Sequence, residues 1–257
     1  MFRFIFLLVS FALAIVGQKK SPTLYIIGDS TVKAGQGDGG NGMWGWGSLI
    51  DNFFDTTALS IENHAIGGRS SRTFLTDGRW EPILAKMGKG DFLIIQFGHN
   101  DDWALNDTIR ARGTIDGIGE EYEEIDNLLT GKHEIVHSYG WYLRKYVNEA
   151  KSKGVEVYIC SPVPFNRYDT HGKIERKKEF YPAWAKQVAI QTSVHFIDLH
   201  EQTALLYDSL GYAKVRENYF TEKDDVHTNL NGAKLNAKMV VKGIRNTPDS
   251  ELKKLLN

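Results

Sequence analysis

The first feature that could carry out chemistry is a small hydroxyl residue placed directly after a short apolar run. Residues 25–31 are Tyr-Ile-Ile-Gly-Asp-Ser-Thr, so Ser30 comes directly after a predicted buried strand that ends at Gly28. Ligands of open α/β sheets bind at the carboxyl ends of the strands, where a serine can act as a nucleophile. The alternative is structural, because a serine at this place can also cap a following helix.

A serine hydroxyl attacks only when a base can take its proton, and the segment 224–227 near the C-terminus supplies one. We expect His227 to be this base. Asp224, three residues earlier, can fold back to the imidazole Nδ1, which would leave Nε2 free for the serine proton. Asp225 competes for the same role by its proximity. The alternative is a solvated acidic turn beside a surface histidine.

Two further segments offer donors for the negative oxygen that forms during acyl transfer. Residues 67–70 are Gly-Gly-Arg-Ser and follow the second predicted strand. Glycine lets a backbone N–H approach a ligand closely, so this turn can provide one donor; a merely flexible turn is the alternative. Asn100 follows another strand and can add its side-chain N–H. With the N–H of Ser30 these groups predict an oxyanion site.

A competing motif lies at residues 133–137, which are His-Glu-Ile-Val-His. This spacing can bind zinc when the segment is helical, but a catalytic zinc site needs a third protein ligand. The extended motif would place a histidine at position 143, where this chain has Leu143. Glu156 lies at a plausible distance along the chain but inside a predicted strand. We therefore expect no metal here and interpret the segment as polar residues at the start of a helix.

The elements that must position these groups alternate along the chain. Apolar runs without polar interruption indicate strands that are buried on both faces, as in a parallel sheet. The predicted strands are Thr23–Gly28, 59–65, 92–97, 155–160 and 194–199. Helical spacing of apolar residues from Tyr139 to Ala150, and after Asn231-Gly232, predicts helices between and after them. This alternation predicts a single α/β domain with helices on both faces of the sheet.

One segment interrupts the alternation. Residues 103–132 are polar, contain several glycines and carry an acidic cluster near position 122. A long loop at the active edge of a compact domain is usually a lid, a wall of the binding site or a disordered insert. We keep these three interpretations open.

The N-terminus predicts export. Residues 4–16 form an apolar run shorter than the roughly 20 residues that cross a bilayer, and Ala12, Ala14 and Gly17 are small residues suited to cleavage. We interpret 1–17 as a signal peptide, with no membrane span after its removal; an uncleaved anchor is the alternative. The mature part divides into a single α/β domain over 21–246, which carries the candidate site, and a short C-terminal tail over 247–257.

Composition excludes some classes of protein. The chain has 257 residues, 42% of them hydrophobic and 25% charged, which is typical of a globular domain. A net charge of −1 gives no electrostatic reason to expect nucleic acid as a partner. Cys160 is the single cysteine, so no internal disulfide can form. The sequence makes no prediction about the oligomeric state.

Four ordered blocks together resemble the SGNH/GDSL hydrolases, and most closely their rhamnogalacturonan acetylesterase branch. The blocks are Gly28-Asp29-Ser30-Thr31, Asn63-x-Ala65-x-Gly67-Gly68-Arg69-Ser70, Gly98-His99-Asn100-Asp101 and Asp224-x-x-His227-Thr228. Each block alone is weak, but their joint order over nearly the whole mature chain is specific.

The resemblance implies a three-layer α/β/α sandwich around a five-stranded parallel sheet, as in flavodoxin, and no metal or cofactor. It places the nucleophile on Ser30, the acid and base on Asp224 and His227, and the oxyanion donors on Gly68, with Gly67 as second choice, and on Asn100 together with Ser30. It also implies an esterase that acts on an acetylated polysaccharide or oligosaccharide. The predicted signal peptide would make this a secreted or periplasmic enzyme.

We expect the substrate to be a pectic polysaccharide such as rhamnogalacturonan. Four arginines near the predicted site could meet its carboxylates, namely Arg69, Arg72, Arg110 and Arg112. Internal ion pairs are the alternative role for these arginines. Rival functions are an SGNH lipase, thioesterase or xylan acetylesterase, and a non-catalytic carbohydrate-binding protein on the same fold; the latter would need no Ser/Asp/His set.

Overall fold

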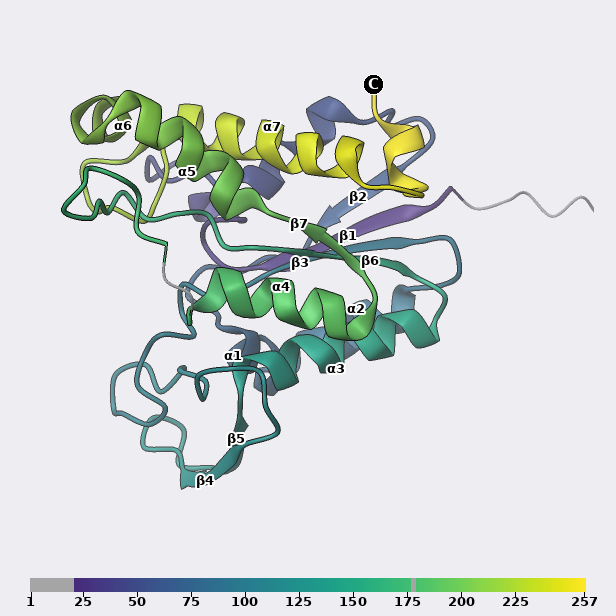
Figure 1. Ribbon diagram of the computed structural model, residues 1–257. Helices are drawn as coiled ribbons and strands as arrows, with labels where there is room; N and C mark the ends of the chain where they lie inside the picture. The colour runs from purple at the N-terminus through teal and green to yellow at the C-terminus, as the bar shows by residue number, and fades with distance from the viewer. Residues whose placement is uncertain (1–20, 177–178) are drawn as a thin grey trace, which may run out of the picture.

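The fold is built on a five-stranded sheet in which every neighbouring pair of strands is parallel (Figure 1). The computed structural model describes residues 21–176 and 179–257, so the predicted signal peptide 1–17 lies outside the described residues. The strands, in spatial order, are β2 (Ser60–Asn63), β1 (Thr23–Gly28), β3 (Phe92–Gln96), β6 (Glu156–Cys160) and β7 (His195–Ile197). This order is that of a flavodoxin-like sheet, and the strand order reverses beside β1.

Helices cover both faces of the sheet and complete the predicted three-layer sandwich (Figure 1). On one face lie α1 (Ser71–Thr76), α2 (Trp80–Lys86), α3 (Tyr139–Ser152) and α4 (Tyr181–Thr192). On the other lie α5 (Leu199–Leu210), α6 (Tyr212–Tyr219) and α7 (Leu230–Asn246). The short 3-10 helices are η1 (Gly35–Gly37), η2 (Trp46–Ser48), η3 (Ile50–Phe53) and η4 (Leu252–Leu255). Within the described residues, no helix is long and apolar enough to cross a membrane.

Strand β1 shows why an unbroken apolar run suits the centre of this sheet. Tyr25 and Ile27 pack into the core beneath α3, whereas Leu24 and Ile26 pack into the core beneath α7. Successive side chains of a strand point to opposite faces, so both faces must be apolar when both are covered. Each fully buried side chain of this size contributes about 1.5–3 kcal/mol to folding. The continuous apolar pattern therefore predicted the central strands correctly.

The C-terminal segment 247–257 packs onto the domain. Leu252 of η4 is fully buried in the core beneath α7. Leu256 forms an isolated antiparallel bridge with Phe54. The segment thus adds apolar contacts to the same layer that holds α7.

The expected helix start at residue 133 was wrong. Residues His133–His137 form strand β5, which pairs antiparallel with β4 (Tyr122–Asp126) in a hairpin that projects from the helix α3 side of the sandwich (Figure 1). Helix α3 starts only after Ser138, whose side chain caps it by accepting the Trp141 N–H. Residues four apart in a strand lie roughly 13 Å apart. The two histidines therefore lack the helical spacing that the zinc motif requires.

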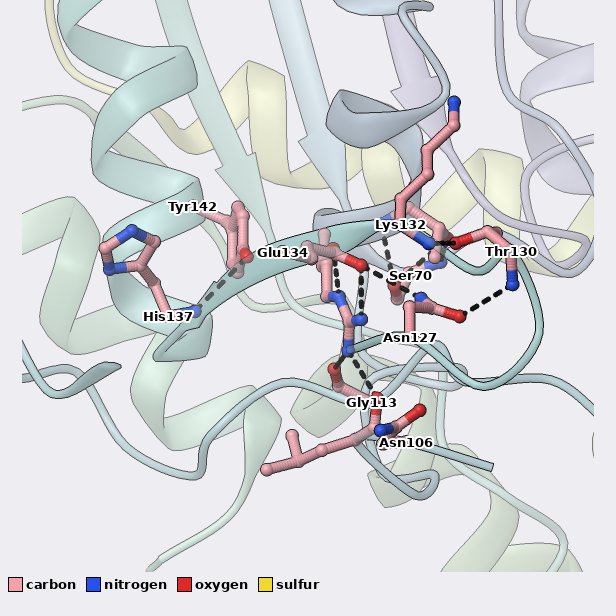
Figure 2. Close-up of polar contacts among 12 residues, drawn as sticks. Ser70, Asn106, Gly113, Asn127, Thr130, Lys132, Glu134, His137 and Tyr142 are labelled. Carbon is pink, nitrogen blue, oxygen red and sulfur yellow. Dashed lines mark hydrogen bonds and ion pairs between the residues drawn. The ribbon is translucent and has the colours of Figure 1, made fainter. Parts of the chain in front are cut away.

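A buried ion pair fastens this hairpin to helix α1. The Arg72 side chain is 0% exposed, and its guanidinium donates to both carboxylate oxygens of Glu134 at 2.6 and 2.7 Å. It also donates to the carbonyl oxygens of Leu105 and Gly113, and Asn127 donates to Glu134 at 2.9 Å (Figure 2). Arg72 is therefore a buried structural residue. Its predicted role as a substrate-binding residue is wrong, because no part of it is exposed to a ligand.

We predict that Glu134→Gln lowers the free energy of unfolding by about 3–5 kcal/mol. The substitution leaves the buried guanidinium of Arg72 without its opposite charge, and breaking one side of a buried pair has a cost of this size. Urea unfolding followed by circular dichroism measures it. Glu124→Gln on the same hairpin is the control: its carboxylate is exposed and lies 3.7 Å from His133. Equal losses in the two variants would contradict the assigned role.

Candidate active site

The candidate nucleophile and one oxyanion donor follow adjacent strands at the point where the strand order reverses. Ser30 comes after β1, and Asn100 comes after β3. The carboxyl ends of such strands leave a crevice that no crossover connection covers. A cleft of about 1100 Å³ lies there, lined among others by Ser30, Gly68, Asn100, Asp224 and His227. The structure thus gathers the five predicted residues in one place.

Three side chains form a continuous hydrogen-bonded relay in this cleft. The Ser30 Oγ lies 2.9 Å from His227 Nε2, and His227 Nδ1 lies 2.7 Å from Asp224 Oδ2. Asp224 and His227 sit in the loop before α7, three residues apart as the sequence analysis expected. This is the arrangement of a nucleophile, a base and an orienting acid.

The protonation of the relay follows from the surroundings of Asp224. Partial burial alone would raise its pKa, but the backbone N–H groups of His227 and Val226 and the His227 ring donate to the carboxylate and bring the net pKa below its usual range. The carboxylate is therefore ionised at neutral pH and can only accept. His227 Nδ1 must carry the proton, so Nε2 is free to accept the Ser30 hydroxyl.

Asp225, the competing acid, has other partners. Its Oδ1 accepts from Arg216 at 3.1 Å and from Asn166 at 3.1 Å. Its backbone carbonyl accepts the Asn166 N–H. The geometry therefore favours Asp224 as the partner of His227 and gives Asp225 a structural role in this loop.

The predicted oxyanion donors each keep an N–H that the protein does not use. Gly68 has φ +76°, a left-handed conformation that disfavours any side chain. Among the described residues, the N–H groups of Ser30 and Gly68 donate to no protein acceptor, and Asn100 uses one of its two amide hydrogens on the Arg69 carbonyl at 3.1 Å. Each thus has a donor left for a ligand, and their action on an oxyanion stays a prediction.

A chain of buried hydrogen bonds holds the turn that carries Ser30. Asp29 is fully buried, and its Oδ1 accepts from the Thr31 N–H and hydroxyl, both at 2.8 Å. Gln96 of β3 donates to the Thr31 hydroxyl and accepts from the Trp46 indole. Gly28 permits this packing, because a Cβ there would lie 2.7 Å from the Gln96 carbonyl oxygen. The nucleophile is therefore attached to β3 as well as to its own strand.

His99 completes this chain as the positive partner of Asp29. Its Nδ1 lies 3.2 Å from Asp29 Oδ2 and its Nε2 lies 3.0 Å from the Val163 carbonyl oxygen. Burial alone would lower the pKa of His99, but Asp29 and the carbonyl raise it above its ordinary value. The same pairing brings the net pKa of Asp29 below its usual range against the effect of burial. This geometry gives His99 a structural role beneath the nucleophile.

Asp101, which follows Asn100, is a buried carboxyl of a different kind. Its Oδ1 accepts from the Ser71 N–H at 3.0 Å and from the Ser71 hydroxyl, whereas its Oδ2 has no hydrogen-bond partner in the described part of the chain. Burial raises the pKa of Asp101 to about 7, against the effect of the hydrogen bonds from Ser71. This group therefore titrates near neutrality, well above an ordinary aspartate.

The remaining candidate arginines divide into two groups. Arg69 pairs with Asp77 at 2.7 Å and does not line the cleft. Arg110 and Arg112 do line it, and both guanidinium groups lie over the Trp103 ring at 4.9 and 4.6 Å. Segment 103–132 therefore contributes a wall of the binding site, one of the three roles considered for it.

Sequence reasoning missed two further cations that line the cleft, Lys33 and Arg167. Arg167 lies 4.6 Å over the Phe165 ring. Neither residue belongs to a recognisable motif, so only the fold could place them here. As for a metal, no group of three or more His, Cys, Asp or Glu side chains among residues 21–176 and 179–257 could hold one.

Comparison with known proteins identifies the family. Residues 26–235 match the GDSL-like Lipase/Acylhydrolase family, which is most of the chain. The chain belongs to this family. Rhamnogalacturonan acetylesterases of Emericella nidulans and Bacillus subtilis (RhgT) are 29% and 30% identical to it, over 91% and 88% of this chain and 89% and 90% of theirs. This GDSL hydrolase thus belongs to the rhamnogalacturonan acetylesterase-like branch, as predicted, and is a carboxylic ester hydrolase.

Solved structures agree on the fold of the esterase. A Bacillus subtilis protein superposes with a TM-score of 0.70 at 22% identity, over 88% of this chain and 56% of that one. An acetyl-xylooligosaccharide esterase from Geobacillus gives a TM-score of 0.59 at 19% identity, over 86% and 93%. At these identities the likeness confirms the three-layer α/β/α fold alone.

We predict that Asp224→Asn lowers kcat of the esterase by about 10³-fold or more, because an amide at this position no longer fixes the proton on His227 Nδ1. Asp225→Asn is the matched control and should cost less than about tenfold, since Asp225 contacts Arg216 and Asn166 instead. Steady-state hydrolysis of p-nitrophenyl acetate measures both. Equal losses, or the reverse order, would refute the assignment.

We predict that Asp101→Asn flattens the dependence of thermal stability on pH. The pKa of Asp101 is about 7 in the folded chain, so its contribution to stability is complete below its ordinary value near 4 and is lost as the pH rises towards 7. Each unit of pKa difference corresponds to about 1.4 kcal/mol. The unfolding midpoint of the wild type should therefore fall more steeply than that of the variant from pH 5 to pH 8. Parallel curves would show that Asp101 titrates normally.

Proposed function

We propose that this esterase removes O-acetyl groups from a pectic polysaccharide such as rhamnogalacturonan. The observation that carries the proposal is an assembled Ser30–His227–Asp224 relay in an open cleft whose lining cations form no ion pair within the described part of the chain. The similarity to rhamnogalacturonan acetylesterases of two organisms supports the substrate class. A purely carbohydrate-binding protein would have no use for the relay.

In the proposed mechanism, the Ser30 oxygen attacks the acetyl carbonyl carbon while His227 Nε2 takes the hydroxyl proton. The carbonyl oxygen becomes negative and is met by the N–H groups of Ser30, Gly68 and Asn100. The sugar oxygen then leaves with the proton from His227, and the acetyl group stays on Ser30. Water, activated by the same histidine, attacks the acetyl-enzyme, and acetate is released.

The charges of the cleft support an anionic sugar chain. Four cations line it, Lys33, Arg110, Arg112 and Arg167, and in the described part of the chain none of them forms an ion pair. Arg112 stays charged at neutral pH even though burial and Arg110 lower its pKa to about 10. Guanidinium groups bind carboxylates through two parallel hydrogen bonds, and galacturonate offers one carboxylate per sugar.

Export is part of the proposal. The interpretation of residues 1–17 as a signal peptide would place the enzyme outside the cytoplasm, secreted or periplasmic, where it could meet a polymer that does not enter the cell. Cys160 is buried and free, so the fold depends on its core and needs no disulfide.

The test compares acetate release from acetylated rhamnogalacturonan and acetylated xylan at equal acetyl concentration, at 0.02 and 0.5 M NaCl. We predict faster release from rhamnogalacturonan at low salt and a marked fall at high salt, because exposed charge attractions are screened. Hydrolysis of p-nitrophenyl acetate should change little with salt. Ser30→Ala should lower all rates by about 10³-fold or more and serves as the background. Equal, salt-independent rates on both polymers would contradict a pectic substrate.

A further inference from the structure

A second hollow adjoins the catalytic cleft on the hairpin side. It has a volume of about 940 Å³, at the upper end of the range for ligand pockets, about 300–1,000 Å³. Gly67, Gly68, Arg110 and Arg112 line both this hollow and the cleft. A chain-like ligand that enters both must therefore pass over the glycine turn beside the nucleophile.

The walls of the second hollow are preformed. One wall is helix α1 and the other is the turn of the β4–β5 hairpin. In that turn, the Asn127 side-chain oxygen accepts the N–H groups of Leu129 and Thr130, both at 3.0 Å. The Asn127 amide donates to Glu134 (Figure 2). The ion pair between Arg72 of α1 and Glu134 of β5 fixes the position of the turn relative to α1. The hollow between them is therefore formed without a ligand.

The second hollow has a net positive charge, because its two carboxylates are each neutralised by an arginine of the protein. Its two carboxylates are already engaged, Asp77 by Arg69 at 2.7 Å and Glu134 by Arg72. The cations that remain are Arg110, Arg112 and Lys132, and none of these has an ion-pair partner among the described residues. The hollow therefore presents donors and positive charge without matching acceptors.

Arg112 gives the most specific indication of a ligand. It is only 7% exposed, and its Nε has no hydrogen-bond partner in the described part of the chain. Its Nη1 donates to the Gly68 carbonyl at 3.0 Å, so one edge of the guanidinium is engaged. A buried donor left without a partner costs about 1–3 kcal/mol. Because Nε itself is buried, a ligand oxygen in either hollow would remove this cost only when the Arg112 side chain shifts toward it.

The rim adds apolar surface. Ile109 is 77% exposed and Leu129 is 49% exposed, and both line the second hollow. Sugar rings present C–H faces between their polar groups and can cover such side chains. Positive charge beside exposed apolar surface suits a carbohydrate with carboxylates better than inorganic anions or a purely apolar ligand.

We propose that the second hollow binds the sugars next to the acetylated residue in an anionic polysaccharide chain. A uronate carboxylate would be met by Lys132 on the hairpin turn and by the free edge of Arg112. This inference rests on the proposed function for its natural ligand, but it concerns a separate surface. It makes the β4–β5 hairpin a determinant of polymer binding.

The test uses Lys132→Glu, because Lys132 is exposed and its side chain has no partner among residues 21–176 and 179–257. The matched control is Lys242→Glu, an exposed residue of α7 on the opposite face of the sheet. On acetylated rhamnogalacturonan at low salt, Lys132→Glu should raise KM about fivefold, the size expected when exposed charge contacts are lost. The effect on p-nitrophenyl acetate should be much smaller, and 0.5 M NaCl should reduce the difference. An unchanged polymer KM, or the same change in Lys242→Glu, would overturn the proposal.

A binding measurement separates this proposal from the proposed function. Calorimetry with trigalacturonate on Ser30→Ala should show weaker binding when Lys132→Glu is added, and no change when Lys242→Glu is added. If the wild type releases no acetate from rhamnogalacturonan but this binding difference is found, the proposed function fails and the anionic sugar site stands. If acetate is released but both charge variants bind trigalacturonate equally, the second hollow is not the site.

Discussion

The structure of the site depends on the pairing of one buried negative charge, the carboxylate of Asp29 beside the nucleophile. A charge removed from water must be paired and hydrogen-bonded, and Thr31 and His99 satisfy it from two sides. These partners come from the turn after β1 and the turn after β3. Satisfying the charge therefore joins the two strand ends that carry Ser30 and Asn100. The position of the nucleophile Ser30 is thus fixed by the need to pair the buried carboxylate of its neighbour Asp29.

The site has two parts with different support. The relay and its buried hydrogen bonds belong to the central strands and to the loop before α7. The cleft walls come from several loops, among them segment 103–132 with Arg110 and Arg112, and the loops that carry Lys33 and Arg167. Arg72 of helix α1 attaches segment 103–137 to the sandwich through Glu134 and two backbone carbonyls. Arg112 connects the two parts, because it lies on the wall but donates to the Gly68 carbonyl. A ligand that contacts Arg112 at the wall is therefore one hydrogen bond away from Gly68, the predicted oxyanion donor.

The sequence predicted those features that depend on local pattern. Unbroken apolar runs predicted the sheet. Short motifs such as Asp224-x-x-His227 predicted residues that the fold brings within 2.7 and 2.9 Å of their partners. The sequence-based prediction failed where the conformation of a segment depends on a partner that is distant along the chain. Strand β5 has only one fully buried residue, Val136, and owes its conformation to pairing with β4 and to the bond between Glu134 and Arg72. The burial of Arg72 and the raised pKa of Asp101 likewise depend on surroundings that no local pattern contains.

The fastening of the hairpin by Arg72 and Glu134 has a consequence for how such enzymes can diverge. The ion pair lies at the base of the hairpin, whereas Leu129, Thr130 and Lys132 lie in its turn. Insertions or replacements in the turn would leave the base and the proton relay in place. Selection could thus exchange one polymer preference for another without rebuilding the reaction, and the hairpin would act as an interchangeable module on a constant hydrolytic core.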